Sequence, residues 1–354
     1  MMPGPTPRQV VLHIGLPKTG TTYLQEGFVR HREALLGCGV SYPIFGQEHL
    51  AGHHNLALHL RGMPLVNADY GDLSAEDALR RALNEDAHAN VLLSSEGFSA
   101  LGAGGVTTLL RAIGGCEPRV VVYLRRRSQL IVSSWQEAVK HGSPLGLLEY
   151  VASRVLESGA RMLRFEQVLT SIAQAFGRDA MRVIVYDHLL EDGVDIMDHF
   201  TSTILGLDNF AASRDRATKS NQSVDAAQLE VVRAVNQLLL VRGGSPSIQQ
   251  TSSLQRLLMH DPAACDLVRR VEEVRERRSE DLDLGVLDGE WLDRDCFVME
   301  HLGDAVCNPA SERQLFRSAQ STVVRMLRPA ELQAAIPLSE FAAIAERVVR
   351  ESTE

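Results

Sequence analysis

Cysteine, aromatic residues and excess positive charge are all scarce in this chain of 354 residues. Its five cysteines are odd in number, lie far apart and form no C-x-x-C pair, so we expect neither a disulfide framework nor a cysteine-ligated zinc site. Aromatic residues make up 5% of the chain, which gives no clear platform of rings for stacking on sugars. With 45 acidic and 36 basic residues the net charge is −9, which argues against nucleic acid or an anionic membrane as a partner.

Long apolar runs are missing as well. No stretch approaches the roughly 18 consecutive apolar residues that a membrane helix needs. The opening residues, MMPGPTPRQ, lack the apolar run of a signal peptide. We therefore expect a cytoplasmic protein without an integral membrane segment. The composition that remains, 45% apolar and 23% charged, is ordinary for a globular chain and suffices for a buried core.

Short apolar runs alternate with amphipathic segments over the first part of the chain, which is the pattern of a parallel sheet covered by helices. The apolar runs are rich in β-branched residues and show no in–out alternation, which indicates strands buried on both faces. The expected strands are 10–14, 91–94, 119–124 and 181–186. The expected helices are 22–36, 74–87, 106–113, 128–140 and 194–205.

The character of the sequence changes after about residue 207. Helical spacing continues there, but no further strand is expected. The helices expected in this part are 224–240, 254–278 and 340–351. We therefore predict an α/β fold, a three-layer parallel sheet flanked by helices, over residues 8–210, and a mainly helical extension that packs on it over residues 211–354.

The most informative segment is GLPKTGTTY at residues 15–23, between an expected strand and an expected helix. In that setting, free backbone N–H groups and the positive end of the helix dipole favour an anion. Gly15 and Gly20 let the backbone fold closely around phosphate oxygens, and Lys18 adds a positive charge. Hydroxyl donors come from Thr19, Thr21 and Thr22. The segment therefore predicts a phosphate-binding loop.

The nearest common motif to this loop is the Walker A sequence, G-x-x-x-x-G-K-[ST]. Its glycine spacing matches Gly15 and Gly20, but the lysine here stands two residues before Gly20, and a threonine follows that glycine. The order PKTGTT at residues 17–22 instead resembles the 5′-phosphosulfate loop of the sulfotransferase superfamily. Members of that superfamily have a P-loop-like fold and use 3′-phosphoadenosine 5′-phosphosulfate (PAPS) as sulfuryl donor.

A second basic feature follows the expected strand 119–124. Arg125 ends this strand, two more arginines follow, and Ser133 lies eight residues later in the expected helix. The carboxyl ends of strands are where open α/β sheets bind ligands, and a guanidinium engages a phosphate through two N–H groups. Arg125 and Ser133 resemble the 3′-phosphate motif of the same superfamily. Together the two motifs point to a donor with phosphate groups at both ends.

The resemblance implies PAPS as co-substrate, no metal, and transfer of a sulfuryl group to a hydroxyl or amine. It places Lys18 at the bridging oxygen, and Thr21 and Thr22 at the 5′-phosphate. Tyr186 matches the tyrosine of the family's Tyr-Glu-Asp-Leu strand end, which contacts the adenosine side, although the acidic pair is replaced here. The residues thereby expected to bind the donor are Pro17, Lys18, Thr19, Gly20, Thr21, Thr22, Tyr23, Arg125, Ser133 and Tyr186.

Two candidates stand for the base that removes the acceptor's proton. Glu96 follows the expected strand 91–94, where the resemblance places the base of this superfamily, but it also fits an electrostatic, substrate-binding or capping role. The competitor is a histidine cluster, with His53 as candidate base because histidine titrates near neutral pH. The cluster consists of His49, His53, His54 and His59. A metal site there is not expected, because Gly52 interrupts the helical spacing and no further ligand type is evident.

The resemblance is incomplete. The Arg-Lys-Gly segment that clamps the 3′-phosphate in cytosolic small-molecule members is absent. The acceptor stays open between a carbohydrate, a lipid-linked compound and a small hydroxylated molecule. One alternative function is an atypical P-loop kinase using ATP and Mg²⁺ with Asp187 as metal ligand, although the position of Lys18 counts against it. The other is a non-catalytic nucleotide-binding module, in which Lys18 and Arg125 would still be needed for binding and Glu96 would not.

Overall fold

The chain divides into two compact units in the computed structural model, which describes most of its residues. The described residues are 8–47, 51–65, 71–87, 90–156, 163–208, 210, 225–243, 246–317 and 322–352. The first unit consists of Met1–Arg126, Arg161–Ser220 and Trp291–Ser318, and the second of Arg127–Ala160, Asn221–Glu290 and Ala319–Glu354. This division differs from the boundary predicted at residue 210, because residues 127–160 belong with the C-terminal helices and residues 291–318 with the sheet.

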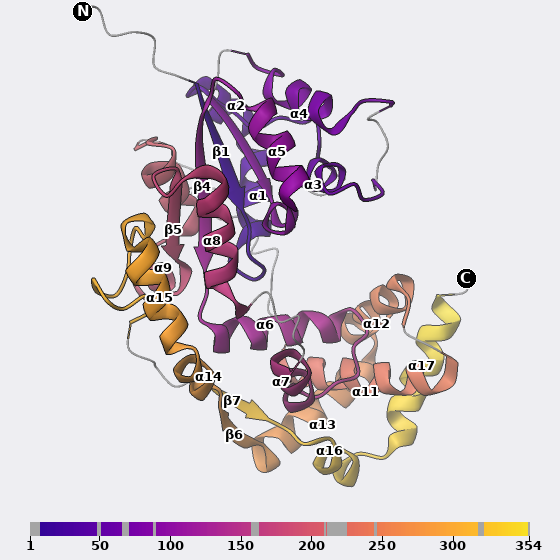
Figure 1. Ribbon diagram of the computed structural model, residues 1–354. Helices are drawn as coiled ribbons and strands as arrows, with labels where there is room; N and C mark the ends of the chain where they lie inside the picture. The colour runs from indigo at the N-terminus through magenta and orange to yellow at the C-terminus, as the bar shows by residue number, and fades with distance from the viewer. Residues whose placement is uncertain are drawn as a thin grey trace, which may run out of the picture. The chain divides into compact units, whose positions relative to one another are not determined.

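A five-stranded parallel sheet lies in the middle of the first unit (Figure 1). In the order β2-β3-β1-β4-β5, its strands are Val40–Ser41, Asn90–Ser95, Gln9–Ile14, Glu117–Leu124 and Met181–Val185. The four strands predicted from the sequence are confirmed. The strand β2 escaped prediction because its two residues are too few to show a pattern.

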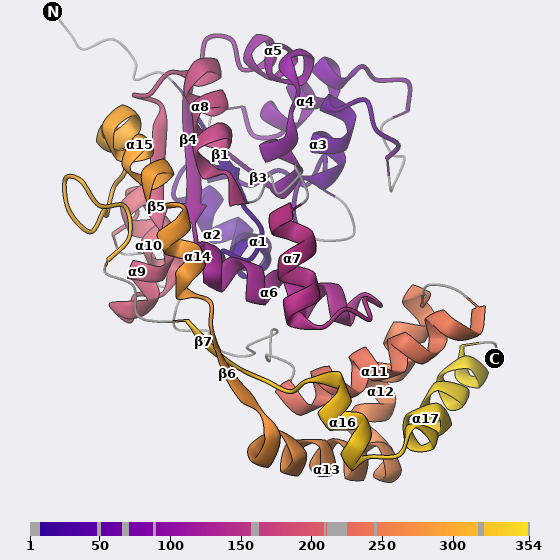
Figure 2. The same ribbon diagram turned by 60° about the horizontal axis from the view of Figure 1, so that its bottom comes forward.

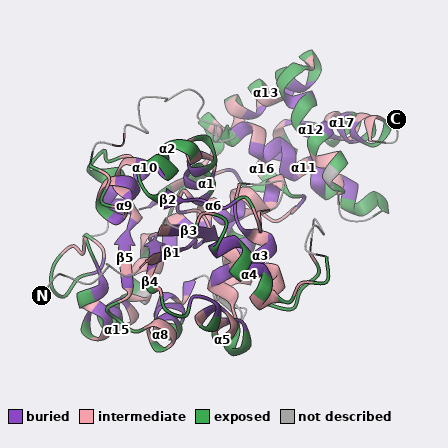
Figure 3. Cartoon of the chain, turned by 90° about the horizontal axis from the view of Figure 1, so that it is seen from above, coloured by how far each residue is buried: buried purple, intermediate pink, exposed green. Residues whose placement is uncertain are grey.

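Helices cover both faces of this sheet, as Figure 3 shows. On one face lie α1 (Thr21–Arg30), α2 (Arg32–Gly37) and α10 (Ile196–His199), and on the other α5 (Ala103–Ala112) and α8 (Phe165–Phe176). Successive strand residues point to opposite faces, so a covered sheet needs apolar residues on both. In β1, Val11 packs in one cluster with Phe28 and Phe200, while Val10 and Leu12 are fully buried on the opposite face. The mixed α/β fold with a sheet between helical layers agrees with the prediction.

Further short elements complete the first unit. They are α3 (His54–Leu60), α4 (Ala75–Leu83), η1 (Glu96–Ala100), α9 (Tyr186–Glu191), η3 (Phe200–Ile204), α15 (Leu292–Leu302) and η5 (Gly303–Ala305). The segment after η5 runs along the edge of β5, where Cys307 N donates to Val183 O (2.8 Å). The part of the first unit that comes last in the sequence therefore protects a sheet edge.

Two of the predicted helices are each broken in two. The breaks fall at His31 in the segment 22–36 and at Asp261 in the segment 254–278. The second segment forms part of α12 (Ile248–His260) and all of α13 (Pro262–Arg278). Pro262 explains this break, because its ring cannot continue a helix from the preceding turn but suits the first position of a new one.

Helices make up most of the second unit. They are α6 (Arg127–Lys140), α7 (Leu147–Leu156), α11 (Ala226–Gly243), α12, α13, α14 (Gly285–Glu290), α16 (Pro329–Ala335) and α17 (Leu338–Glu351). The helix α11 packs against α13 and α17 (Figure 2), and also against α6. Asn236 of α11 donates from Nδ2 to the carbonyls of Val139 (2.8 Å) and Ser143 (3.2 Å), which ties α11 to the end of α6.

The second unit also contains strands, so the prediction of no strand beyond residue 207 is wrong. The strand β6 (Glu280–Asp283) pairs antiparallel with β7 (Val323–Met326). Each strand has four residues, and three of the four in β6 are acidic, which leaves no apolar alternation to detect. No helix in the described ranges of either unit is both long and apolar enough to span a membrane.

Candidate functional site

Four loops of the first unit meet at the carboxyl edge of its parallel sheet. They follow β1, β3, β4 and β5, and they carry the segment 15–20, Glu96, Arg125 and Tyr186. The strand order reverses between β1 and β4, because the chain goes to β2 and β3 on one side before it crosses to β4 and β5. Such a reversal opens a crevice at the strand ends, where open α/β sheets bind their ligands.

The loop between β1 and α1 has the backbone of an anion-binding turn. Lys18 has a φ of 65° and Gly20 a φ of 77°, both in the left-handed region. Gly20 is the N-cap residue of α1 and, as a glycine, supplies no side-chain cap to this helix end. First-turn N–H groups have no partner within their own helix, and the helix dipole favours an anion at that place.

The three threonines of the loop have different surroundings. Thr19 and Thr21 are buried, and both hydroxyls point to the carbonyl of Leu16, at 2.7 and 3.4 Å. Thr22 is exposed in the first turn of α1. A Cβ on Gly15 would lie 2.7 Å from the side chain of Thr21, so the loop needs glycine there. Thr19 and Thr21 thus shape the loop through their side chains, while the hydroxyl of Thr22 is accessible to a ligand.

Arg125 lies against the phosphate loop. Its Nη1 donates to Lys18 O (2.8 Å), and its Nε is buried without a hydrogen-bond partner among the described residues. Its guanidinium carbon lies 5.9 Å from the centre of the Tyr186 ring, and the Tyr186 hydroxyl would lie 3.4 Å from a Cβ placed on Gly20. Burial raises the pKa of Tyr186, against the opposing charge of Arg125. The structure therefore brings together Lys18, Gly20, Arg125 and Tyr186.

The residues behind Arg125 fix the chain after β4. Asp187 accepts a hydrogen bond from Arg126 N (2.7 Å), and the Arg126 guanidinium donates to Glu191 (2.9 Å) and to the carbonyl of Arg317 (3.1 Å). Burial raises the pKa of Asp187, while the adjacent backbone N–H and arginines oppose this shift. Asp187 therefore supports the loop that carries Arg125. No sequence motif pointed to Arg317, which lies far along the chain.

Glu96 lines a cavity of about 450 Å³ next to the phosphate loop. The cavity walls come from α1, α3 and the end of β3; the lining residues are Thr22, Gln25, Glu26, Ala51, His54, Ala57, Leu58, Arg61, Ser95, Glu96 and Gly97. The Cγ of Glu96 would lie 3.0 Å from a Cβ on Gly15, so this side chain rests against the start of the loop. A carboxylate therefore stands between the anion-binding loop and a cavity of suitable size for a small acceptor.

The structure gives His53 a structural place instead of the predicted catalytic one. His53 is fully buried, its Nδ1 accepts a hydrogen bond from Ser94 N (3.2 Å), and its Nε2 donates to Pro43 O (3.0 Å). Burial lowers its pKa to about 3. Its neighbour His54 lines the cavity, with Nδ1 at 3.1 Å from Ser95 Oγ. Both ring nitrogens of His53 are thus engaged by backbone, and the cavity histidine is His54.

The remaining predicted residues have different surroundings. The Tyr23 hydroxyl donates to Asp195 Oδ2 (3.0 Å) and so ties α1 to α10, and burial together with this bond raises its pKa to about 12. Pro17 is half-buried in the loop itself. Ser133 is half-buried on α6 in the second unit, and its part in donor binding stays a prediction. His49 lies outside the described residues.

Two buried histidines of the first unit predict a loss of stability in acid. Burial lowers the pKa of His13, like that of His53, from 6.5 to about 3. The unfolded chain therefore binds more protons than the folded one between these values, so stability is full above pH 6.5 and is lost as the pH falls towards 3. In this window each histidine lowers the free energy of unfolding by about 1.4 kcal/mol for each pH unit of acidification. The loss for both histidines together between pH 6.5 and 4.5 is about 5 kcal/mol.

Urea unfolding at pH 7.0, 5.5 and 4.5 measures this dependence. The His53→Asn variant keeps an acceptor near Ser94 N. Because only His13 then remains, the part of the slope of unfolding free energy against pH that the two histidines cause should be about halved. The exposed His141 gives the control, because His141→Asn should leave the slope as it is. Equal slopes for His53→Asn and the unaltered protein would contradict the assignment.

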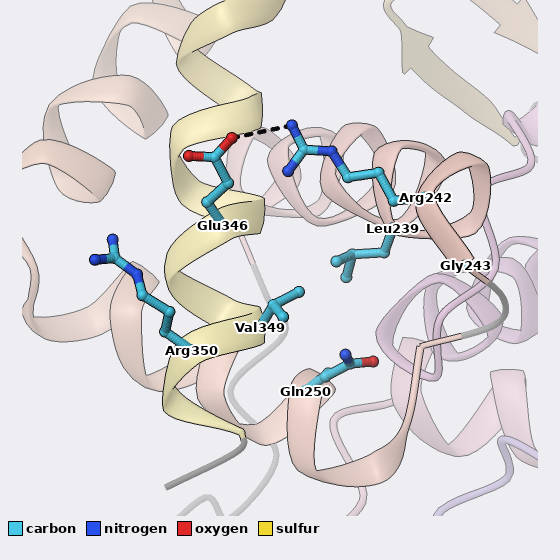
Figure 4. A pocket seen from close by; sticks show the side chains of 7 residues that line it. All are labelled: Leu239, Arg242, Gly243, Gln250, Glu346, Val349 and Arg350. Carbon is cyan, nitrogen blue, oxygen red and sulfur yellow. Dashed lines mark hydrogen bonds and ion pairs between the residues drawn. The ribbon is translucent and has the colours of Figure 1, made fainter.

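A larger hollow lies in the second unit, where the ends of α11, α12 and α17 meet (Figure 4). It has a volume of about 790 Å³, and its floor includes Leu239 and Val349. Arg242 at its rim is paired with Glu346 (3.1 Å). No loop of the glycine–lysine type adjoins it among the described residues. The sheet edge of the first unit is therefore the stronger candidate for a catalytic site.

Comparison with known proteins adds a distant likeness. No family model matches the chain, and no curated protein sequence matches it. Among solved structures, the chain is similar to a sulfotransferase from Alicyclobacillus acidocaldarius, with 15% identity and a TM-score of 0.40. The alignment covers 71% of this chain and 100% of that one. At these values the likeness carries no functional conclusion, and the proposal below depends on the residues of the chain itself.

Proposed function

We propose that the first unit binds PAPS and transfers its sulfuryl group to a hydroxyl or amine of an acceptor. The observation that carries this proposal is the hydrogen bond from Arg125 Nη1 to Lys18 O, at 2.8 Å. It places the Arg125 guanidinium against the main chain of Lys18, and the sequence motifs assign these two residues to opposite ends of one donor. An uncapped helix end adds anion-binding N–H groups at the same place. The cytoplasmic location expected from the sequence is part of this proposal.

Each group has a role in an in-line displacement. The acceptor oxygen or nitrogen attacks sulfur, and the bond from sulfur to the bridging oxygen of the 5′-phosphate breaks. The Lys18 ammonium neutralises the charge that develops on this leaving phosphate, and the α1 amides with the Thr22 hydroxyl hold its oxygens. The acceptor proton passes to Glu96, which lines the adjoining cavity. Arg125 holds the 3′-phosphate.

Neither alternative function fits these contacts as well. A P-loop kinase needs its lysine after Gly20, and the carboxylate considered as its metal ligand, Asp187, already accepts a hydrogen bond from Arg126 N. A non-catalytic binding module has no use for a carboxylate between the phosphate loop and a cavity. The place of Glu96 therefore favours an enzyme.

Calorimetric titration tests the donor. We expect the product bisphosphate, 3′-phosphoadenosine 5′-phosphate, to bind more tightly than ATP with Mg²⁺ and than 5′-AMP, which lacks the 3′-phosphate. The Arg125→Ala variant should lose about 10- to 100-fold of the affinity for the bisphosphate. It should lose less for 5′-AMP, because only the contact of Arg125 with the loop is then removed. A preference for ATP with Mg²⁺ would overturn the proposal in favour of the kinase, and equal losses for both ligands would contradict the role of Arg125.

A further inference from the structure

Gln25 belongs to the cavity, although no sequence pattern pointed to it. It lies in α1, is 4% exposed, and lines the cavity together with Glu96. Its Nε2 donates to Ser94 Oγ (3.1 Å), and Ser94 Oγ lies 2.8 Å from His13 Nδ1. A buried chain of polar groups therefore runs from the middle of the sheet to the cavity wall.

His13 forms the end of this polar chain inside the sheet. Its Nε2 is buried and has no hydrogen-bond partner among the described residues. The rings of Tyr123 and Phe200 meet the imidazole nearly at right angles, with centroids 5.8 and 5.5 Å away. Ser94 Oγ accepts the hydrogen bond from Gln25 Nε2 and shares a second hydrogen bond with His13 Nδ1.

Gly52 lies beside the amide of Gln25. A Cβ on Gly52 would lie 2.6 Å from Gln25 Nε2 and 2.5 Å from His54 Nε2, so the packing around this amide leaves no room for a larger residue at position 52. The bond to Ser94 is the one hydrogen bond that this amide makes with other described residues. The carbonyl Oε1 is therefore the amide atom that can face the cavity.

We propose that Gln25 is a specificity-determining residue, whose Oε1 accepts a hydrogen bond from the acceptor beside its reacting group. This inference rests on the proposed function. Glu96 takes the proton of the reacting group, so Gln25 Oε1 is left to accept a hydrogen bond from a second donor on the same molecule. No aromatic ring is among the described residues that line the cavity, which disfavours a flat phenol. The acceptor class is a vicinal diol or amino alcohol, as in sugars and amino sugars.

Matched pairs of small probes test this inference. The pairs are cyclohexanol with cis-cyclohexane-1,2-diol and cyclohexanol with trans-2-aminocyclohexanol, whose members differ by one donor group. Binding is measured by calorimetry in the presence of saturating bisphosphate, and turnover with radiolabelled PAPS. We expect the unaltered protein to prefer each two-donor probe by about tenfold, because a site built around a hydrogen bond rejects a ligand that lacks its partner.

The variants separate specificity from structure. In Gln25→Leu the preference should shrink to near one, with cyclohexanol and bisphosphate binding unchanged. Ser94→Ala keeps Gln25 but releases its amide, so the preference should fall to an intermediate value. Gln167→Leu, on the exposed side of α8, should keep the full preference.

The outcomes distinguish two kinds of failure. An undiminished preference in Gln25→Leu overturns the inference, as does equal loss of all probes or failure of both two-donor probes to bind. Each of these results leaves the proposed function standing if the bisphosphate binds. If the unaltered protein does not bind the bisphosphate, the proposed function fails, and the inference fails with it.

Discussion

Replacing Lys18 by glycine is expected to lower kcat for sulfuryl transfer by about a thousandfold or more while the protein stays folded. The ammonium group is the one charge that the loop brings to the leaving phosphate, and neutralising that charge is the main task in this displacement. The main-chain carbonyl of Lys18, which accepts the hydrogen bond from Arg125, is kept in the variant. The loss should therefore fall on turnover and much less on bisphosphate affinity.

Glycine is a sharper substitute here than alanine. Lys18 has a φ of 65°, which costs an ordinary side chain about 1 kcal/mol or more, whereas glycine adopts it freely. The Lys18→Gly variant should therefore unfold in urea at the same midpoint as the unaltered protein or a slightly higher one. Lys18→Arg, which keeps a positive charge, should retain part of the activity, and Lys140→Ala on α6 should retain nearly all of it. Turnover by Lys18→Gly close to that of the unaltered protein would remove Lys18 from the mechanism.

The sequence was a sufficient guide where a pattern is local and repeated. The strands β1, β3, β4 and β5 are continuous apolar runs because both faces of the sheet are covered, and each was predicted within two residues. A phosphate loop could be predicted because its lysine and glycines stand at fixed spacing in one segment. Arg125 could be predicted because it ends an apolar strand and the carboxyl ends of parallel strands meet at one edge.

Neighbouring residues with the same chemistry could not be separated in this way. His53 and His54 are adjacent, yet one is buried between Pro43 and Ser94 and the other lines the cavity. The turn of the chain ahead of α3 decides which of them points inward, and no periodicity records that turn. His53 as the base is therefore not part of the proposed function.

Long-range partners were also outside the reach of sequence patterns. Gln25 has its role only because Ser94 and Gly52, from two other segments, approach its amide. Asn308 exchanges hydrogen bonds with the backbone of Val185 at 2.7 and 3.1 Å, just before Tyr186, although 123 residues separate them. Such contacts depend on how the chain returns to the sheet, which a single sequence does not display.

Glu96→Gln is expected to lower kcat by about a hundred- to a thousandfold with little change in bisphosphate affinity. The proposed role of Glu96 in proton removal rests on its place, because it lines the cavity and its Cγ approaches Gly15 at the start of the phosphate loop. Glutamine has the same size and can still hydrogen bond to an acceptor, but it cannot take a proton.

Glu26 gives a matched control for this experiment, because its carboxylate lines the same cavity from α1. If a negative charge in the cavity were all that mattered, Glu26→Gln and Glu96→Gln would lose activity to a similar degree. If proton removal is the task, Glu26→Gln should stay within a few-fold of the unaltered rate. A full rate in Glu96→Gln, with a loss in His54→Asn, would instead place the base on α3, because His54 is the histidine that reaches the cavity.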